Sequence, residues 1–421
     1  MKASFSADYN KICQAASSVV RFIKNLGGIA VNNCKAIEIS EKIYWVGAVD
    51  WSMRNFHGYE TGRGTTYNAY LILDEKITLI DTAKIDFSDE LIARISSVID
   101  PAQIEVIISS HVEPDHSGSL KKIAFLAPKA EIYTTNPNGI KGLTARYGKL
   151  NYKAVKAGDS VKIGVRTLQF VPTPMLHWPD SMVTYCPEEK ILFSNDAFGE
   201  HLATSLRFDD ENDLSTIFFE AQKYYANILM PFGKQAQNAL KTLGNLEMRM
   251  IATGHGVIWR KNIDKIIDCY KKWSAGEVSE RAVVVFDSMW HSTEILAQTI
   301  TEAFAKRKIS AAYYDIKKNA LSDIMTDVLT SKYLIVGSPT INNQMMPTIA
   351  GFLSYLKGLR PVNHKGFAFG SYGWGGQSIA MVEEELKSAG VEIILEKIRV
   401  ANVPTAAQLD EIAEKILALE L

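Results

Sequence analysis

The sequence predicts an α/β protein of two domains, because the pattern of its apolar runs changes near residue 280. From residue 37 to about 260, short strand signals are dense and helical stretches lie between them. After residue 281, strands and helices alternate regularly, which indicates a doubly wound parallel sheet. A chain of 421 residues with 47% hydrophobic content is long enough and apolar enough for two such cores.

Composition excludes several classes of partner. The formal net charge of -1 gives no electrostatic reason to expect nucleic acid or a membrane surface as partner. No apolar run is long enough to cross a bilayer. The four cysteines form no C-x-x-C pair, which excludes a rubredoxin-type iron site within this sequence and is typical of a reducing, cytoplasmic compartment.

The first 36 residues differ in composition from the rest. Asp8 is their only acidic residue, against five Lys and Arg residues. We expect a cytoplasmic protein in which this segment is a short helix or tail that packs on the domain surface. The alternative is a transit peptide for a hydrogenosome or another mitochondrion-related organelle, because acid-poor, serine-containing amphipathic N-termini can have that role.

In the first domain, 37–260, apolar and β-branched runs predict strands and amphipathic runs predict helices. We expect strands at 43–46, 70–73, 77–80, 104–108 and 191–193, and helices at 89–99 and 216–229. Residues 261–280, rich in Lys and Asp, are expected to form a connecting helix. In the second domain, 281–421, we expect strands at 281–286, 311–316, 333–336, 366–369 and 392–395, with a helix at 293–306.

A six-residue segment in the first domain has the composition of a metal site. His111, Glu113, Asp115 and His116 follow the predicted strand 104–108, so they lie on the loop at its carboxyl end. Four potential ligands in six positions are unusual for a core or an ordinary turn. Imidazole and carboxylate together suit iron, manganese or zinc.

Three further candidate ligands occur downstream. His177, Asp196 and His255 each follow an apolar stretch and stand at a strand end or turn. One such histidine would most often be structural. Four histidines with three carboxylates in strand-end positions instead indicate a two-metal site.

Three loops of the second domain suit a phosphate-bearing flavin. The first follows strand 281–286 and opens a helix with hydroxyl groups, which suits a phosphate. It has no G-x-G-x-x-G pattern, which favours a phosphate monoester such as FMN over a dinucleotide. The other two follow later strands and could hydrogen-bond and cover the flavin ring. The candidate residues are Ser288, Met289, Trp290, Ser292, Thr293, Ser338, Pro339, Thr340, Asn342, Asn343, Ser371, Tyr372, Gly373, Trp374 and Gly375.

The run H-x-E-x-D-H, followed by separate His, Asp and His residues, resembles the flavodiiron branch of the metallo-β-lactamase superfamily. The resemblance covers residues 37–421. It implies an N-terminal metallo-β-lactamase-like αββα sandwich and a C-terminal flavodoxin-like domain. Hydrolases of the superfamily carry a second histidine where this chain has Glu113. A carboxylate there is a harder, charged donor, which favours a redox iron pair over a zinc pair.

The resemblance also implies roles for the candidate ligands. One iron is assigned to His111, Glu113 and His177, the other to Asp115, His116 and His255, and Asp196 bridges them. The equivalent of His116 does not coordinate in every family member, so this residue is either a ligand or a neighbour of the pair.

Two residues of the segment 55–59 also match the family. The resemblance places His57 and Tyr59 at the open face of the iron pair, as donors of protons or hydrogen bonds. The alternative for His57 is a structural histidine.

The function implied is that of an oxidoreductase with two non-haem iron ions and FMN. It would reduce dioxygen to water, nitric oxide to nitrous oxide, or both, with electrons from an external rubredoxin, reductase or reduced deazaflavin. The family arrangement is a head-to-tail homodimer or a dimer of such dimers. The alternatives are a zinc metallo-hydrolase fused to a flavodoxin domain, which Glu113 disfavours, and a non-catalytic electron carrier.

Overall fold

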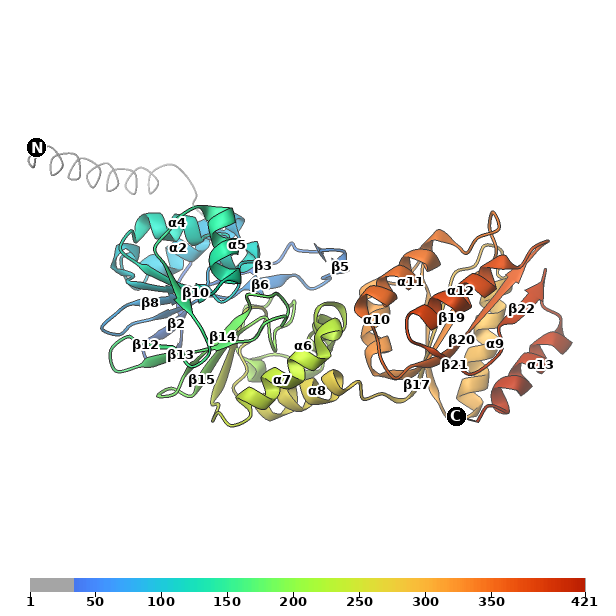
Figure 1. Ribbon diagram of the computed structural model, residues 1–421. Helices are drawn as coiled ribbons and strands as arrows, with labels where there is room; N and C mark the ends of the chain where they lie inside the picture. The colour runs from blue at the N-terminus through green and yellow to red at the C-terminus, as the bar shows by residue number, and fades with distance from the viewer. Residues whose placement is uncertain (1–33, 421) are drawn as a thin grey trace, which may run out of the picture.

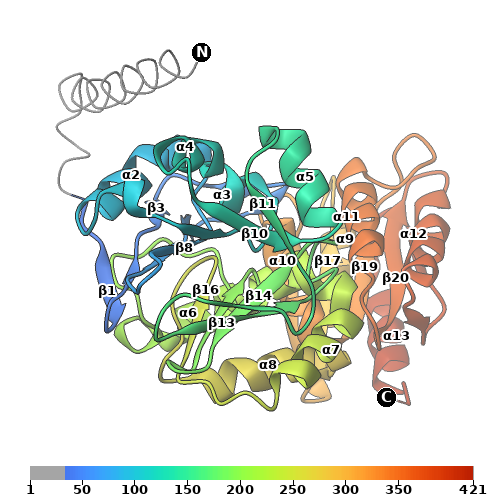
Figure 2. The ribbon, with the colours of Figure 1, turned by 60° about the vertical axis from the view of Figure 1, so that its left-hand side comes forward.

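The computed structural model describes residues 34–420. The predicted targeting segment or surface helix at 1–36 therefore lies almost wholly outside the described residues. Figure 1 shows two bodies side by side along the chain, and Figure 2 shows the same arrangement turned by 60°. None of the helices within 34–420 is both long and apolar enough to cross a bilayer.

The N-terminal body begins with a seven-stranded mixed sheet in the order β1-β2-β7-β8-β9-β10-β11. Its first four strands pair antiparallel, and from β8 onward the pairing is parallel. The strands are β1 (Ile37–Ser40), β2 (Ile43–Trp45), β7 (Tyr70–Ile72), β8 (Thr78–Ile80), β9 (Val106–Ile108), β10 (Glu131–Thr135) and β11 (Tyr152–Val155).

A second sheet of five strands faces the first, in the order β12-β13-β14-β15-β16. Apolar side chains of both sheets form one buried cluster, which includes Trp45, Ile108, Phe170 and Phe193. The strands are β12 (Ser160–Lys162), β13 (Thr167–Pro172), β14 (Met182–Cys186), β15 (Ile191–Asn195) and β16 (Met250–Thr253).

Helices cover the outer face of each sheet, which makes four layers. On the first sheet lie α2 (Ser88–Ser96), α4 (Leu120–Leu126) and α5 (Asn138–Tyr147). On the second lie α6 (Leu214–Tyr224), α7 (Gly233–Leu243) and α8 (Ile263–Ala275). This is the αββα sandwich that the family resemblance implies. The helix expected at 261–280 is α8, and it buries Ile266, Tyr270 and Trp273 in the same core as α6 and α7.

The C-terminal body is a parallel sheet in the order β18-β17-β19-β20-β21 with helices on both faces. Helices α9 and α13 cover one face, and α10, α11 and α12 cover the other. The strands are β17 (Ser279–Phe286), β18 (Ser310–Asp315), β19 (Ser331–Gly337), β20 (Lys365–Tyr372), β21 (Glu392–Ile393) and β22 (Ile398–Ala401). The helices are α9 (Ser292–Lys306), α10 (Leu321–Thr330), α11 (Pro347–Leu359), α12 (Gln377–Ser388) and α13 (Ala406–Leu417).

Two details of the expected elements are wrong. The predicted strand 392–395 ends at Ile393, and the unpredicted β22 pairs with β20 beyond it. The predicted helix 216–229 is α-helical only to Tyr224 and continues as a π-helical turn over Tyr225–Leu229. Its apolar pattern runs across the change, so periodicity could not reveal it.

Two small hairpins extend from the first body toward the second. Strand β3 (Ala48–Asp50) pairs with β6 (Thr65–Tyr67), and between them β4 (Asn55–Phe56) pairs with β5 (Tyr59–Glu60). In Figure 1 the β4–β5 tip points at the C-terminal body. There the side-chain hydroxyl of Ser322, in α10, is 3.4 Å from the Glu60 carbonyl oxygen.

The two bodies also meet through α6 and the π-helical turn. The Gln222 amide donates to the Thr326 carbonyl at 2.8 Å, and the Asn227 amide donates to the Ser322 carbonyl at 3.1 Å. Lys223 pairs with Asp323 at 2.5 Å. One face of the helix that covers the second sheet thus contacts the flavodoxin-like body.

Candidate metal centre and flavin loops

The six-residue segment 111–116 begins three residues after Ile108, the last residue of β9, and continues into a helix of one turn, α3 (Pro114–Ser117). Glu113 has an extended backbone, and Pro114 takes the first helical position, where its missing N–H costs nothing. Asp115 and His116 then follow within that turn. Because the backbone changes from extended to helical within these six residues, the side chains of His111 and Glu113 lie in one group and those of Asp115 and His116 in another.

The first group consists of His111, Glu113 and His177. His111 Nε2 lies 3.2 Å from Glu113 Oε2, and His177 Nε2 lies 3.5 Å from the same oxygen. His177 comes from the loop after β13. Three donors at such spacings can share an ion at about 2.1 Å from each.

The second group consists of Asp115, His116 and His255. Asp115 Oδ2 lies 3.3 Å from His255 Nε2 and 3.7 Å from His116 Nε2. His255 follows β16 in the second sheet, so this group joins loops of both sheets. All three side chains are buried.

Asp196 stands between the two groups, just after β15. Its Oδ2 lies 3.5 Å from His177 Nε2 and 3.8 Å from His111 Nε2. Its Oδ1 lies 2.9 Å from His116 Nε2 and 3.5 Å from His255 Nε2. One carboxylate therefore presents one oxygen to each group, as a bridging ligand would.

Unpartnered atoms show that these residues fit metal ions. Both carboxylate oxygens of Asp115, both ring nitrogens of His116 and Asp196 Oδ2 are buried and make no hydrogen bond of acceptable geometry among residues 34–420, although His116 Nε2 approaches Asp196 Oδ1 to 2.9 Å. Buried polar atoms are normally hydrogen-bonded, and unpaired ones are costly. Coordination would satisfy most of these atoms. His116 belongs to the second group on the same geometric terms as His255.

The electrostatics of the centre favour bound cations. Burial opposes protonation of the histidines, but nearby carboxylates outweigh it. Hydrogen bonds to Asp180 and Glu113 raise the pKa of His111 to about 10. Asp115 and Asp196 raise the pKa of His116 to about 9 and of His255 to about 10. Without metal, the centre would attract protons instead.

Several residues that support the ligands were not predicted from the sequence. Asp180 Oδ2 lies 3.2 Å from His111 Nδ1 and accepts the Val112 N–H at 2.7 Å. The Thr66 carbonyl lies 2.6 Å from His255 Nδ1. Such contacts fix the ring orientation of a ligating histidine. Asp180 lies three residues after His177, and this nearness of a carboxylate to a candidate ligand was the one feature of the sequence that could have indicated its role.

Tyr224 also supports the centre. Its hydroxyl donates to Asp196 Oδ1 at 3.1 Å, from α6. In sequence it is one aromatic residue in an apolar helix, so nothing distinguished it. Packing of α6 on the second sheet places it here.

The structure separates the two residues expected at the open face. His57 Nε2 lies 2.9 Å from Glu113 Oε1, and its side chain is 73% exposed, which suits a group at the mouth of the centre. Tyr59 is buried, and its ring lies 5.4 Å from that of His201. The ring of His201 lies 4.9 Å from that of His255, which puts Tyr59 behind a second histidine rather than against the ligands.

The three candidate flavin loops lie at the carboxyl ends of β17, β19 and β20. The sheet order is the flavodoxin-like 2-1-3-4-5, whose ligand site is the switch point between its first and third strands, here β17 and β19. Thr293 and Ser371, from two of these loops, are hydrogen-bonded at 2.8 Å. Ser288 Oγ is buried without a partner among the described residues, which suits a bound phosphate oxygen.

Aromatic side chains stand exposed beside these loops. Trp290 is 86% exposed and Trp374 is 96% exposed. Tyr372 is partly buried, with the Arg399 guanidinium 5.4 Å from its ring centre. Large exposed aromatic surface of this kind is typical of a ligand or partner contact.

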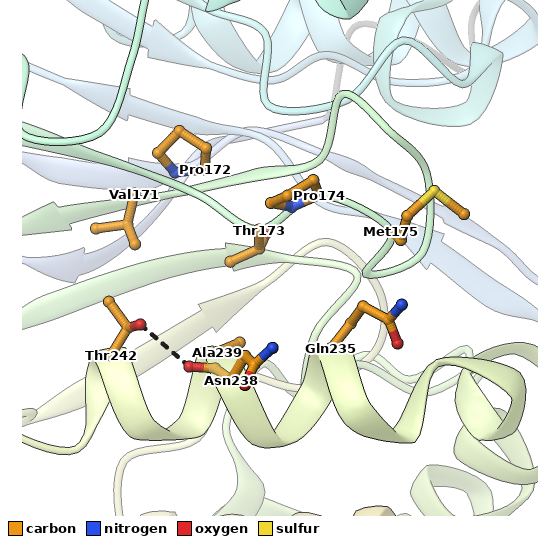
Figure 3. A pocket seen from close by; sticks show the side chains of 9 residues that line it. All are labelled: Val171, Pro172, Thr173, Pro174, Met175, Gln235, Asn238, Ala239 and Thr242. Atoms are coloured by element: carbon orange, nitrogen blue, oxygen red, sulfur yellow. Dashed lines mark hydrogen bonds between the residues drawn. The ribbon is translucent and has the colours of Figure 1, made fainter.

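A cavity of about 360 Å³ lies between α7 and the end of β13 (Figure 3). Its lining includes Pro174 and Met175, from the loop that carries His177, and Gln235 and Asn238 from α7. None of the seven candidate ligands is among the described residues that line it. It is therefore distinct from the metal centre.

The fold and the centre together define a class: a metallo-β-lactamase-like domain joined to a flavodoxin. Family models agree, since residues 65–256 match the ODP family beta lactamase and residues 284–416 match flavodoxin. Among curated proteins, a nitric oxide reductase of Moorella thermoacetica is 44% identical over 366 residues, covering 86% of this chain and 92% of the relative. An anaerobic nitric oxide reductase flavorubredoxin of Salmonella arizonae is 42% identical over 86% of this chain and 77% of its own.

Two solved structures are also similar. Rubredoxin oxygen:oxidoreductase of Desulfovibrio gigas has a TM-score of 0.88 at 38% identity, covering 91% of this chain and 98% of that one. The flavodiiron protein of Giardia intestinalis has a TM-score of 0.89 at 34% identity, covering 91% and 96%. The chain belongs to the flavodiiron proteins. The predictions of family, fold class and oxidoreductase activity are confirmed.

Proposed function

We propose that the chain reduces dioxygen to water, nitric oxide to nitrous oxide, or both, at a pair of non-haem iron ions supplied with electrons through FMN. The observation that carries this proposal is the pair of three-residue groups that share Asp196, in one chain with flavodoxin-like loops. Support comes from similar proteins, which include nitric oxide reductases and an oxygen oxidoreductase.

The ligand assignment we propose follows the geometry. His111, Glu113 and His177 would hold one iron, Asp115, His116 and His255 would hold the other, and Asp196 would contribute one oxygen to each. Such an iron pair would supply electrons for reduction of the gas. Glu113 adds a negative charge that stabilises the oxidised form of its iron. His57 lies against Glu113 at the exposed mouth of the centre, where it can donate a proton.

We propose that FMN binds at the loops after β17, β19 and β20. The hydroxyl-bearing turn at the start of α9 would hold its phosphate, and the loops that contain Ser338 and Ser371 would contact the ring. Electrons would come from an external donor, either a rubredoxin-type protein, a reductase or a reduced deazaflavin. The name of one similar structure includes rubredoxin, which favours the first.

We also propose a head-to-tail dimer, in which the FMN of one chain approaches the iron pair of the other. The exposed Trp290 and Trp374 beside the flavin loops support a partner contact there. Sedimentation of the purified protein tests this directly. A monomer at micromolar concentration would contradict it.

The decisive experiment combines metal analysis with rapid mixing. Purified protein should contain about two iron ions and one FMN per chain. After anaerobic reduction, mixing with oxygen and separately with nitric oxide should reoxidise the flavin, and the faster reaction identifies the preferred substrate. Two zinc ions and no iron would instead support the metallo-hydrolase. Flavin reoxidation that persists in metal-free protein would support a simple electron carrier.

A further inference from the structure

Buried polar atoms without partners line the wall between the metal centre and the flavodoxin-like body. Among residues 34–420 they include Tyr59 Oη, Thr61 Oγ1, His201 Nε2 and Glu220 Oε2. Buried polar atoms that lack a protein partner are normally satisfied by ordered water. Four of them in neighbouring elements therefore indicate internal water behind the candidate ligands.

Glu220 stands at the outer end of this wall. It lies on α6, and its side chain is 4% exposed. Its Oε1 pairs with Arg63 Nε at 3.1 Å, and the Arg63 side chain is 57% exposed, so the ion pair reaches solvent. One helical turn further along the same face of α6, the Tyr224 hydroxyl contacts Asp196.

The groups around Glu220 make its carboxyl able to hold a proton. Burial raises its pKa, and Asp323 of α10 adds to that effect, while Lys223 and Arg63 lower it. Two further ionisable groups interact electrostatically with Glu220: Tyr59 of β5, and Glu200 in the loop after β15. The net direction is upward from the ordinary value.

Tyr59 and His201 occupy the space between Glu220 and the ligands. The Lys223 ammonium, one turn from Glu220 on α6, lies 5.7 Å from the centre of the Tyr59 ring, so Tyr59 packs against the helix that carries Glu220. Burial and the charge of Glu220 both raise the pKa of the Tyr59 hydroxyl. The Tyr59 ring lies 5.4 Å from the His201 ring, which lies 4.9 Å from that of His255. His201 Nδ1 is held by Thr65 Oγ1 at 2.8 Å, so the ring is fixed in this position.

We propose that Glu220 supplies protons to the metal centre through internal water held by Tyr59 and His201. The inference rests on the proposed function: dioxygen needs four protons with four electrons to give two waters, and two nitric oxide molecules need two of each. In each step the Glu220 O–H bond breaks, its proton passes to an adjacent water, and that water releases another proton inward. Arg63 and Lys223 stabilise the carboxylate until solvent reprotonates it.

The test replaces Glu220 with Gln, with Tyr59→Phe as a second variant and Glu302→Gln as control. Glu302 is an exposed carboxylate of α9 in the flavodoxin-like body. Infrared difference spectra of the wild type at pH 7 should contain a protonated-carboxyl band that Glu220→Gln removes. Proton uptake in single turnovers, followed by a pH indicator, should slow at least tenfold in Glu220→Gln and remain unchanged in Glu302→Gln. Tyr59→Phe should slow it as well, and Glu220→Asp should restore part of the rate.

Each outcome separates the two proposals. Suppose that the wild type consumes oxygen or nitric oxide, and that Glu220→Gln protein with normal FMN and iron content takes up protons as fast as the wild type. The proton route is then wrong, and the proposed function stands. If the wild type consumes neither gas, both are wrong. Should Glu220→Gln bind less metal, the Tyr59→Phe protein decides the matter, and a wild-type rate of proton uptake in it would overturn the route.

Discussion

Asp180 offers a direct test of how the first group of ligands holds its ion. One oxygen, Oδ2, contacts both His111 Nδ1 at 3.2 Å and the Val112 N–H at 2.7 Å. The carboxylate is buried and fixes the ring whose other nitrogen faces Glu113. Asp180→Ala removes both contacts, while Asp180→Asn keeps one oxygen and removes the charge.

The expected effect follows from these contacts. Loss of an outer partner of a ligating histidine typically lowers metal affinity by about 10- to 100-fold. Since each factor of ten is about 1.4 kcal/mol, the loss is about 1.4–2.8 kcal/mol. Asp180→Ala should approach the upper value, because it also leaves the buried Val112 N–H unpaired. Asp180→Asn should lie near the lower value.

The assay is titration with an iron chelator, with iron per chain measured after removal of the chelator. The wild type should release its two ions together, whereas Asp180→Ala should fall to about one ion per chain at lower chelator concentration. Asp115, His116 and His255 do not contact Asp180 and should keep their ion. Asp159→Asn is the matched control, because that half-buried carboxylate also accepts a backbone N–H, from Lys156 at 3.0 Å. Equal chelator midpoints for wild type and Asp180→Ala would refute the reasoning.

Three further perturbations have defined outcomes. Asp196→Asn should leave FMN fluorescence unchanged but abolish consumption of oxygen and nitric oxide; continued consumption would contradict the bridging role. His364 is buried, and burial lowers its folded-state pKa to about 4, so its stabilising contribution is present above pH 6.5 and is lost as pH falls toward 4. Between pH 7 and pH 5, the free energy of unfolding of the wild type should therefore fall by about 2 kcal/mol more than that of His364→Asn. The measurement is unfolding in urea, with release of FMN as the signal. Gly366→Ala should lower the free energy of unfolding by about 1–3 kcal/mol in the same assay, because the added Cβ would lie 1.8 Å from the Leu334 carbonyl oxygen. Gly351→Ala, at an exposed position of α11 with open space around it, should raise that free energy by up to about 1 kcal/mol. Equal urea midpoints for the two variants would contradict the steric argument.

Strong periodic patterns made much of the fold predictable. Strand β17 and helix α9 match their predicted ranges within two residues, because long apolar or amphipathic runs report burial directly. Two-residue strands such as β4, β5 and β21 give no such signal. Such short strands form only because a partner strand lies beside them, across a tight turn for β4 and β5 and on β20 for β21. The sequence therefore did not predict them or misplaced their ends.

The sequence alone determined which side chains could bind metal. Residues 111–116 concentrate four candidate ligands at a strand end, and His177, Asp196 and His255 each follow an apolar run, so their chemistry and local position could be predicted from the sequence. The hydroxyl-rich turn after β17 was readable in the same way.

Only the tertiary structure decided how those side chains divide and what surrounds them. The two sheets bring the loops after β9, β13, β15 and β16 together, so that the two oxygens of Asp196 face different groups. Packing of α6 then places Tyr224 against Asp196 and Glu220 behind Tyr59. These contacts join residues far apart in the chain, and a local pattern cannot encode a distance that depends on how sheets and helices pack.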